Sequence, residues 1–348
     1  MLTSACALAL AFGGNALAAY NPSLLVAGTS HALDSGGPVV IGVGQDQNDD
    51  ATGVINIYSP LGYGVTLGQA PGTKIGDLDA VVKVGALGGA RVEITGTVTA
   101  RDPAQYVNPQ QFPCGGGVRH EAVWLIESTL AGNPLQIPAY VDRVTAGPEA
   151  AFASAKIRIC LASPYVPPPQ GAAAGASLIV AAFSVTNVFN NPNTRGSYPW
   201  QGVFVPYTVG TATLNTANAA QSMSITRLPV QLAVTAKRFK RGGKRFARVT
   251  ACLSEAGVGV RGINVNFLAG RTARKTSRVK RARTNSRGCA TVLIPMRFKV
   301  MYFRASASVP DRDATSGGCT PTLAPRCTSV TIAPAFNLRS RNTFRLRR

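Results

Sequence analysis

Apolar and polar positions alternate along many short segments of this chain. In Arg91–Thr99, Val92, Ile94 and Val98 share one parity, and charged residues and threonines mostly take the other. The same alternation recurs in residues 135–141, 155–161, 230–234, 247–253 and 263–267. A period of two predicts strands with one buried and one solvated face, as in antiparallel sheets. We therefore predict an all-β protein, with a large antiparallel β-sandwich followed by a smaller one.

Charge divides the chain near Arg227–Pro229. Residues 1–228 hold 10 Lys/Arg and 12 Asp/Glu, a net charge of −2, whereas residues 229–348 hold 26 Lys/Arg and 3 Asp/Glu, a net of +23. The two values sum to the formal charge of +21. A change this sharp predicts a domain boundary and different partners for the two halves.

These patterns define four expected segments. They are a signal peptide at 1–19, a β-sandwich domain at 20–228, a basic domain at 229–335 and a basic tail at 336–348. The run Val166–Ala176 is rich in Pro, Ala and Gly. It is either a surface loop of one large sandwich or a break between two domains. We favour the loop, because strand-like runs continue directly after it and need sheet partners.

Residues 1–19 resemble a secretory signal. An apolar stretch, Ala5–Phe12, precedes Ala16-Leu17-Ala18, which fits a small-x-small cleavage site. A buried apolar strand or short helix is the alternative. No apolar run reaches the length of about 20 residues that spans a bilayer, so we expect no transmembrane segment. We expect a secreted protein associated with the cell envelope.

Six cysteines follow the expected signal. An even number in a secreted chain predicts disulfides, and six cysteines allow 15 pairings. Domain membership favours Cys114–Cys160, Cys252–Cys289 and Cys319–Cys327. Cys252 and Cys289 share parity with polar neighbours, so their bridge is expected on the outer face of one sheet. A zinc site is the weaker alternative, because the sequence has no Cys-x2-Cys pair.

The turns and strands of the basic half follow a recognisable order. The turn Glu255–Gly262 leads into Ile263–Phe267, the turn Thr284–Gly288 leads into another strand, and Val300–Val309 ends in alternating alanines. This order resembles bacterial immunoglobulin-like domains of the invasin/intimin type over about residues 229–310. The resemblance implies an immunoglobulin-like sandwich in an adhesin, a spacer or an appendage of an extracellular enzyme. In the first half, Val54–Tyr63 resembles secreted proteins of high-GC Gram-positive bacteria.

Motifs that would support catalysis are incomplete. Asp34-Ser35-Gly36-Gly37-Pro38 matches the nucleophile segment of chymotrypsin-like proteases, but the upstream His and Asp of that family have no place before it. Asp46–Asp50 has the initial spacing of a calcium loop without its Gly and final Glu. We therefore read these two segments as turns and His120-Glu121 as a strand end. We expect no catalytic residues, no metal and no cofactor.

The basic half contains two clusters of cations that we assign as candidate anion-binding residues. The first comprises Lys237, Arg238, Lys240, Arg241, Lys244 and Arg245. The second comprises Arg274, Lys275, Arg278, Lys280 and Arg281. Clustered cations attract polyanions, which outside a cell include cell-wall polymers, anionic polysaccharides and lipid headgroups. A surface that only confers solubility is the alternative. The sequence predicts no recognition helix, so we expect no specific nucleic acid as a binding partner.

The function we expect is therefore that of a non-catalytic extracellular or cell-envelope binding protein, adhesin-like in type. Its basic domain would contact anionic polymers. The first half would add a second surface through Trp124, Trp200, Tyr207 and Asn190–Asn193. Two alternatives stay open: an extracellular hydrolase with an appended immunoglobulin-like domain, and a passive structural spacer.

Overall fold

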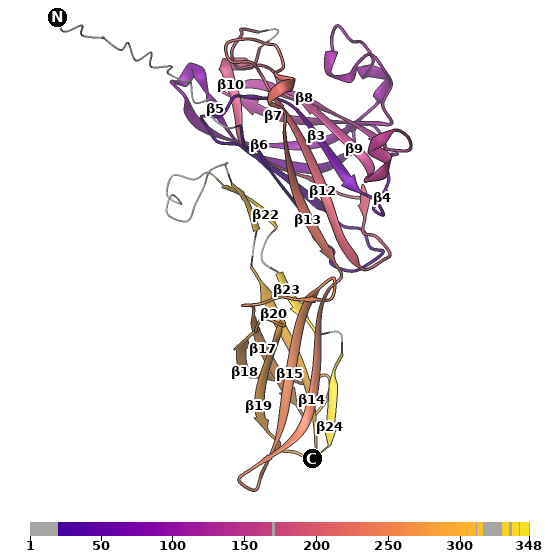
Figure 1. The fold of residues 1–348 in the computed structure, drawn as a ribbon, viewed down its shortest axis with the longest axis vertical. Helices are drawn as coiled ribbons and strands as arrows, with labels where there is room; N and C mark the ends of the chain where they lie inside the picture. The colour runs from indigo at the N-terminus through magenta and orange to yellow at the C-terminus, as the bar shows by residue number, and fades with distance from the viewer. Residues whose placement is uncertain are drawn as a thin grey trace, which may run out of the picture.

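The structure, a computed structural model, describes residues 20–168, 171–310, 312–315, 329–333, 336–340 and 342–347. The expected signal peptide and the expected Cys319–Cys327 pair lie outside these residues. The chain is all-β, as the alternation predicts, with two β domains stacked end to end (Figure 1). Its helices are short 3-10 turns, and among the described residues none is long and apolar enough to cross a membrane.

The first domain is built from one antiparallel sheet, which has eleven strands in the described part of the chain. Their order is β1-β2-β10-β5-β6-β7-β8-β9-β3-β12-β13. The bounds are β1 Ser23–Gly28, β2 Val39–Gly44, β3 Thr52–Pro60, β5 Lys74–Val84, β6 Ala90–Arg101, β7 Ala122–Leu130, β8 Asn133–Arg143, β9 Ala153–Cys160, β10 Ala176–Val185, β12 Gly196–Pro206 and β13 Ala220–Leu228. Strands β4 (Gly64–Val65) and β11 (Phe189–Asn190) pair with each other. The 3-10 turns are η1 Gly85–Leu87, η2 Pro103–Tyr106, η3 Pro113–Gly115, η4 Pro148–Ala151, η5 Ala173–Gly175 and η6 Thr216–Asn218.

This sheet curls so that its first and last strands, β1 and β13, contact each other. The backbone N–H groups of Leu24 and Val26 in β1 donate to the hydroxyls of Ser222 and Ser224 in β13, at 2.9 and 2.8 Å. The inner residues of all parts of the sheet, including Ile41, Ile57 and Trp200, therefore form one core. The two walls expected of a sandwich are thus parts of a single sheet.

The second domain is a sandwich of two sheets around its own core. One sheet contains β14 (Val230–Arg241), β15 (Lys244–Glu255), β16 (Val258–Gly259) and β19 (Cys289–Pro295). The other contains β17 (Asn264–Gly270), β18 (Ser277–Arg283), β20 (Val300–Val309), β23 (Phe336–Arg339) and β24 (Phe344–Arg347). Residues 336–339 and 344–347, assigned from sequence to a basic tail, are therefore strands that pair with β20.

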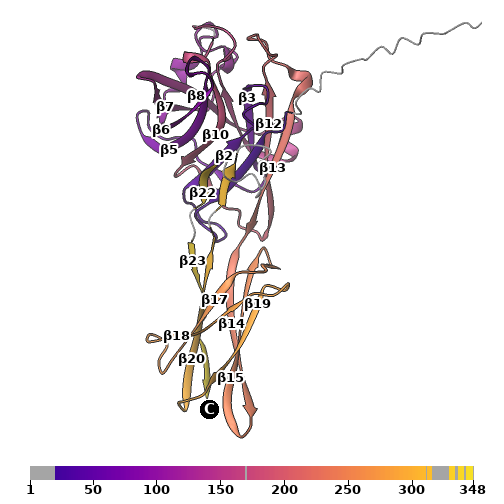
Figure 2. The same ribbon diagram turned by 90° about the vertical axis from the view of Figure 1, so that its left-hand side faces the viewer.

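The domains are joined by more than the chain passing from β13 to β14. The N–H of Val230 donates to the carbonyl of His31 at 3.0 Å, at the start of the second domain. After β20 the chain returns to the first domain as a hairpin of β21 (Arg312–Thr315) and β22 (Ser329–Ala333). This hairpin lies beside β1, β2 and β10 (Figure 2), on strands whose outer positions, including Ala27 and Val180, form a small apolar cluster.

Candidate anion-binding surface

Alternation in the second domain directs cations to the outer face of one sheet. In β20, Met301, Phe303 and Ala305 are buried, while the residues between them point outward and include Arg304. In β24, Arg345 and Arg347 take the outward positions opposite Tyr302 and Val300 of β20. Residues that face each other in an antiparallel pair share a face. The outward cations of neighbouring strands therefore lie on one surface.

We call this surface the arginine face. Its members come from the edge strand β18, the central strand β20 and the last two strands of the sheet. They are Arg278, Arg281, Arg283, Arg304, Arg339, Arg345 and Arg347. Residues 229–348 contain three acidic residues, Glu255, Asp311 and Asp313, whereas the described strands of this sheet contain none.

One row across the sheet shows how the cations are spaced. Arg281 of β18 is opposite Asn266 of β17, Asn266 is opposite Ser306 of β20, and Ser306 is opposite Arg339 of β23. Strands lie about 4.8 Å apart, so the backbones of Arg281 and Arg339 are about 14 Å apart in this row. Between them lie polar side chains, and the Oδ1 of Asn266 is buried without a hydrogen-bond partner. The row combines separated cations with neutral hydrogen-bonding groups.

Two arginines of the arginine face are held in place through Nε. The Nε of Arg283 donates to the carbonyl of Gly262 at 3.1 Å, and the Nε of Arg304 donates to the hydroxyl of Thr343. Guanidinium carries five donors in a planar fork, so these bonds leave the terminal nitrogens for a ligand. Tethering reduces the side-chain entropy that is lost when an anion binds.

A second group of cations, the basic pole, lies at the end of the domain farthest from the first domain (Figure 1). It comprises Arg238, Lys240, Arg241, Lys244, Arg245 and Lys299 around the tip of the β14–β15 hairpin. At this tip Gly242 and Gly243 both have positive φ, which suits a two-residue turn with the twist of the strands. Arg245, Lys299 and Arg347 line one open hollow, so the pole continues into the arginine face.

Ion pairing distinguishes the two domains. Among the residues that the structure describes, all ion pairs lie in the first domain, as in Arg101–Glu127 at 2.7 Å and Lys156–Glu149 at 2.9 Å. The cations of the second domain instead contact carbonyls, hydroxyls and rings, as Arg248 does 4.4 Å above the ring of Phe239. Their charge is therefore not neutralised within the described chain.

The structure brings together only some of the cations assigned from sequence. Arg278 and Arg281 belong to the arginine face, and Arg238, Lys240, Arg241, Lys244 and Arg245 to the basic pole. Lys280 lies on the edge strand β18 but has the opposite parity to Arg281, so it does not point to the arginine face. Lys237 lies on the other sheet. Arg274 and Lys275 lie in the loop between β17 and β18. The candidates assigned from sequence did not include Arg283, Arg304 and Lys299. They also did not include Arg339, Arg345 and Arg347, which were assigned to a basic tail. Arg304 occupies a polar position in an alternating strand, so its pattern could have identified it.

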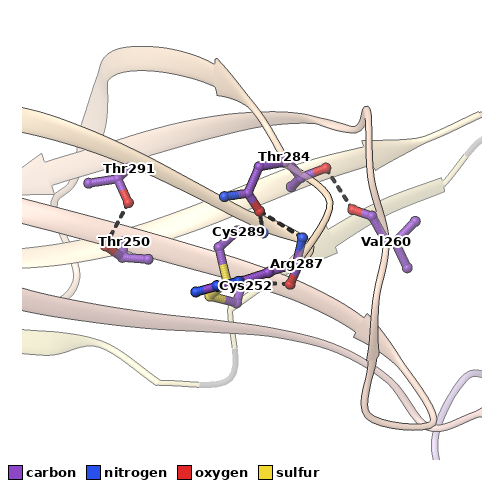
Figure 3. The surroundings of a disulfide bond; sticks show 8 residues. Thr250, Cys252, Val260, Thr284, Arg287, Cys289 and Thr291 are labelled. Atoms are coloured by element: carbon purple, nitrogen blue, oxygen red, sulfur yellow. Dashed lines mark hydrogen bonds between the residues drawn. A yellow bond between two sulfur atoms is a disulfide. The ribbon is translucent and has the colours of Figure 1, made fainter.

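The disulfide Cys252–Cys289 joins neighbouring strands β15 and β19 (Figure 3). The two residues are directly opposite each other, and two residue pairs further along, on the same face, the hydroxyls of Thr250 and Thr291 hydrogen-bond at 2.9 Å. The bridge therefore lies on the outer face of one sheet, as its parity predicts. In the first domain Cys114 is bonded to Cys160 of β9, which fixes the loop that packs on Val123 of β7 and Tyr140 of β8.

The other motifs have hydrogen bonds that hold local structure. His120 contacts the carboxylate of Asp142 at 2.7 Å and the carbonyl of Gly115 at 3.0 Å, so both ring nitrogens are engaged. The carboxylate of Asp46 accepts the N–H of Asn48 at 2.9 Å, which forms a turn. The expectation that Trp124 and Trp200 offer a binding surface is wrong, because both are fully buried in the core.

Comparison with known proteins identifies no family. No family model matches the chain, and no curated protein matches it. Among solved structures, it is similar to domains D2 and D3 of the major pilin SpaD from Corynebacterium diphtheriae. The match has 10% identity and a TM-score of 0.25, and it covers 90% of this chain and 89% of that chain. A match this distant does not establish an arrangement or a function. The invasin/intimin resemblance of residues 229–310 stays a prediction.

Proposed function

We propose that this protein is a secreted, non-catalytic binding protein of the cell envelope, held on an anionic polymer by its second domain. The observation that carries the proposal is the arginine face, together with the finding that all ion pairs of the described residues lie in the first domain. The first domain pairs cations with its own acids, whereas the second displays the seven arginines of the arginine face on a sheet whose strands contain no acid. Unpaired cations on a fixed scaffold bind polyanions through counterion release.

The type of cation favours oxyanions as the bound groups. Of the 26 cations in residues 229–348, 20 are arginines. Guanidinium binds phosphate, sulfate or carboxylate in a bidentate manner, whereas the lysine ammonium acts as a point charge. Solubility alone does not require arginines in preference to lysines, nor their alignment across neighbouring strands.

The experiment compares two triple variants of the full-length oxidised protein. The face variant carries Arg281→Ala, Arg304→Ala and Arg339→Ala, and the control carries Lys237→Ala, Arg261→Ala and Arg287→Ala. Both lose three charges, but the control positions lie outside the arginine face. Binding to polyphosphate, a sulfated polysaccharide and DNA is measured by titration at several salt concentrations.

We expect the face variant to bind its preferred polymer at least about tenfold more weakly than the control at physiological salt. We also expect the wild type to favour one polymer. Equal loss in both variants, with equal affinity for all three polymers, would show that total charge alone acts and would refute the proposal.

A further inference from the structure

An apolar cavity of about 350 Å³ lies inside the curled sheet of the first domain. Its walls come from strands on opposite sides of the sheet, including β3, β7 and β10, and include Ile55, Ile126 and Phe183. Protein interiors are normally packed with few voids larger than a water molecule. A cavity of this size is therefore much larger than the voids that normal packing leaves.

The cavity has a local cause in the sequence. Val43, Ala181, Ala80 and Ile94 form one row across β2, β10, β5 and β6. All four line the cavity, and the two neighbouring alanines are the small members of the row. Larger side chains at Ala80 and Ala181 would extend into the same space.

The chemistry of the lining is uniform. No charged residue lines the cavity, and the polar residues that do are Thr52, Gln136 and Ser177. Gln136 and Ser177 alternate with residues that pack against the core, so their side chains point to the outer face of the sheet. The hydroxyl of Thr52 already bonds to Tyr20 at 2.6 Å, so it is not free to bind a ligand. The interior can solvate hydrocarbon but not charge.

The entrance is itself apolar. Leu135, Ile137, Leu161 and Leu178 are partly buried and pack against the core. All four also line the cavity, together with residues of the loop that precedes β10, such as Pro164 and Ala172. A ligand that enters here meets apolar side chains first and buried side chains beyond them.

We propose that this cavity binds a neutral molecule with an alkyl or acyl chain, whose polar end stays at the entrance. A dry 150 Å³ cavity accommodates one benzene molecule, so this cavity has room for about twelve carbon atoms. Pockets of this volume and lining are typical of small-molecule sites. The site is independent of the arginine face, which lies in the other domain.

The test uses the full-length oxidised protein and 1-aminonaphthalene, a small neutral dye of ten carbons and one nitrogen whose emission changes in apolar sites. A neutral dye avoids the arginine face, which would attract an anionic one. We expect saturable binding that 1-decanol displaces, with an affinity that does not depend on salt. Absence of decanol-displaceable binding would overturn the proposal.

Variants then locate the dye. Ala80→Leu and Ala181→Leu each add three carbons to the cavity, and Ala70→Leu adds the same group at an exposed position. We expect the cavity variants to bind dye about tenfold more weakly, with an unfolding temperature no lower than that of the wild type, and the control to bind normally. If a leucine variant does not fold, Ala181→Val tests the same position with a smaller side chain.

Folded cavity variants that bind dye like the wild type would place the dye elsewhere and refute the site. The triple variant of the arginine face separates this proposal from the proposed function. It should lose polymer binding and keep dye binding, so the two proposals can fail independently.

Discussion

The side-chain amide of Asn342 pairs with both backbone groups of Val234. Its Nδ2 donates to the carbonyl of Val234 at 2.8 Å, and its Oδ1 accepts the N–H of the same residue at 3.2 Å. Val234 lies in β14, whereas Asn342 lies between β23 and β24 of the opposite sheet. One amide thus supplies what a neighbouring strand would supply and connects the two sheets of the second domain.

Removing this amide should destabilise the protein. We expect Asn342→Ala to lower the free energy of unfolding by about 1 kcal/mol, because two backbone groups of β14 lose their partner. Chemical unfolding of the full-length protein, followed by far-UV circular dichroism, measures the change. Asn337→Ala, at an exposed position of β23, is the matched control and should leave the midpoint unchanged. Identical midpoints in both variants would contradict this role.

The disulfide of the second domain should contribute more than the amide. Cys252 and Cys289 are 37 residues apart in sequence, so the bond closes a sizeable loop in the unfolded chain. We expect the double variant Cys252→Ser and Cys289→Ser to lose about 2–4 kcal/mol. Differential scanning calorimetry would detect the loss as a lower unfolding temperature. The pair Thr250→Val and Thr291→Val, two positions away on the same face, should change it much less.

Acid should weaken the contact between β9 and the turn η4. Burial alone would raise the pKa of Glu149, but hydrogen bonds from Lys156 at 2.9 Å and Tyr58 at 2.6 Å outweigh it and leave the pKa below its ordinary value of 4.5. A lowered pKa in the folded state stabilises the protein above pH 4.5, and this contribution disappears as the pH falls below that value.

We therefore expect the wild type to lose stability between pH 5 and pH 3 more steeply than Glu149→Gln does. Urea midpoints across this range test the difference, with Glu93→Gln at an exposed position as the control. Parallel pH profiles for the wild type and Glu149→Gln would contradict the assignment.

Salt dependence offers an independent measure of the arginine face. Each phosphate contact contributes about 0.7 to 0.9 to the slope of log K against log salt. Loss of Arg281, Arg304 and Arg339 should therefore reduce that slope by about 2 to 3 for a phosphate polymer. Titrations between 50 and 300 mM salt would measure it. An unchanged slope would show that these side chains do not contact the polymer.

Local patterns predict local features of this chain well. The alternation in Arg91–Thr99 lies within β6, and parity places Cys252 and Cys289 on an outer face. The first sheet ends with β13 at Leu228 and the second domain begins with β14 at Val230, near the change in net charge. These features depend on neighbours in sequence, which is why sequence reasoning reaches them.

Features that depend on distant pairing were not predictable in the same way. Nothing near Leu24 or Ser222 indicates that β1 and β13 meet, because their contact depends on the curl of the whole sheet. The high positive charge of β23 and β24 obscured their strand pattern in the sequence. Phe344 and Leu346 alternate with Arg345 and Arg347, a strand pattern that net charge alone presents as a solvated tail.

The return of β21 and β22 to the first domain makes the protein resistant to separation by a single cut. A protease that cleaved beside Pro229 would leave the hairpin lying on β1, β2 and β10, still joined through β20 to the second domain. Both pieces would stay associated until that hairpin detached. A fragment that begins at residue 229 would therefore carry the β21–β22 hairpin without the strands β1, β2 and β10 on which it lies. The first domain alone would have these strands without the hairpin.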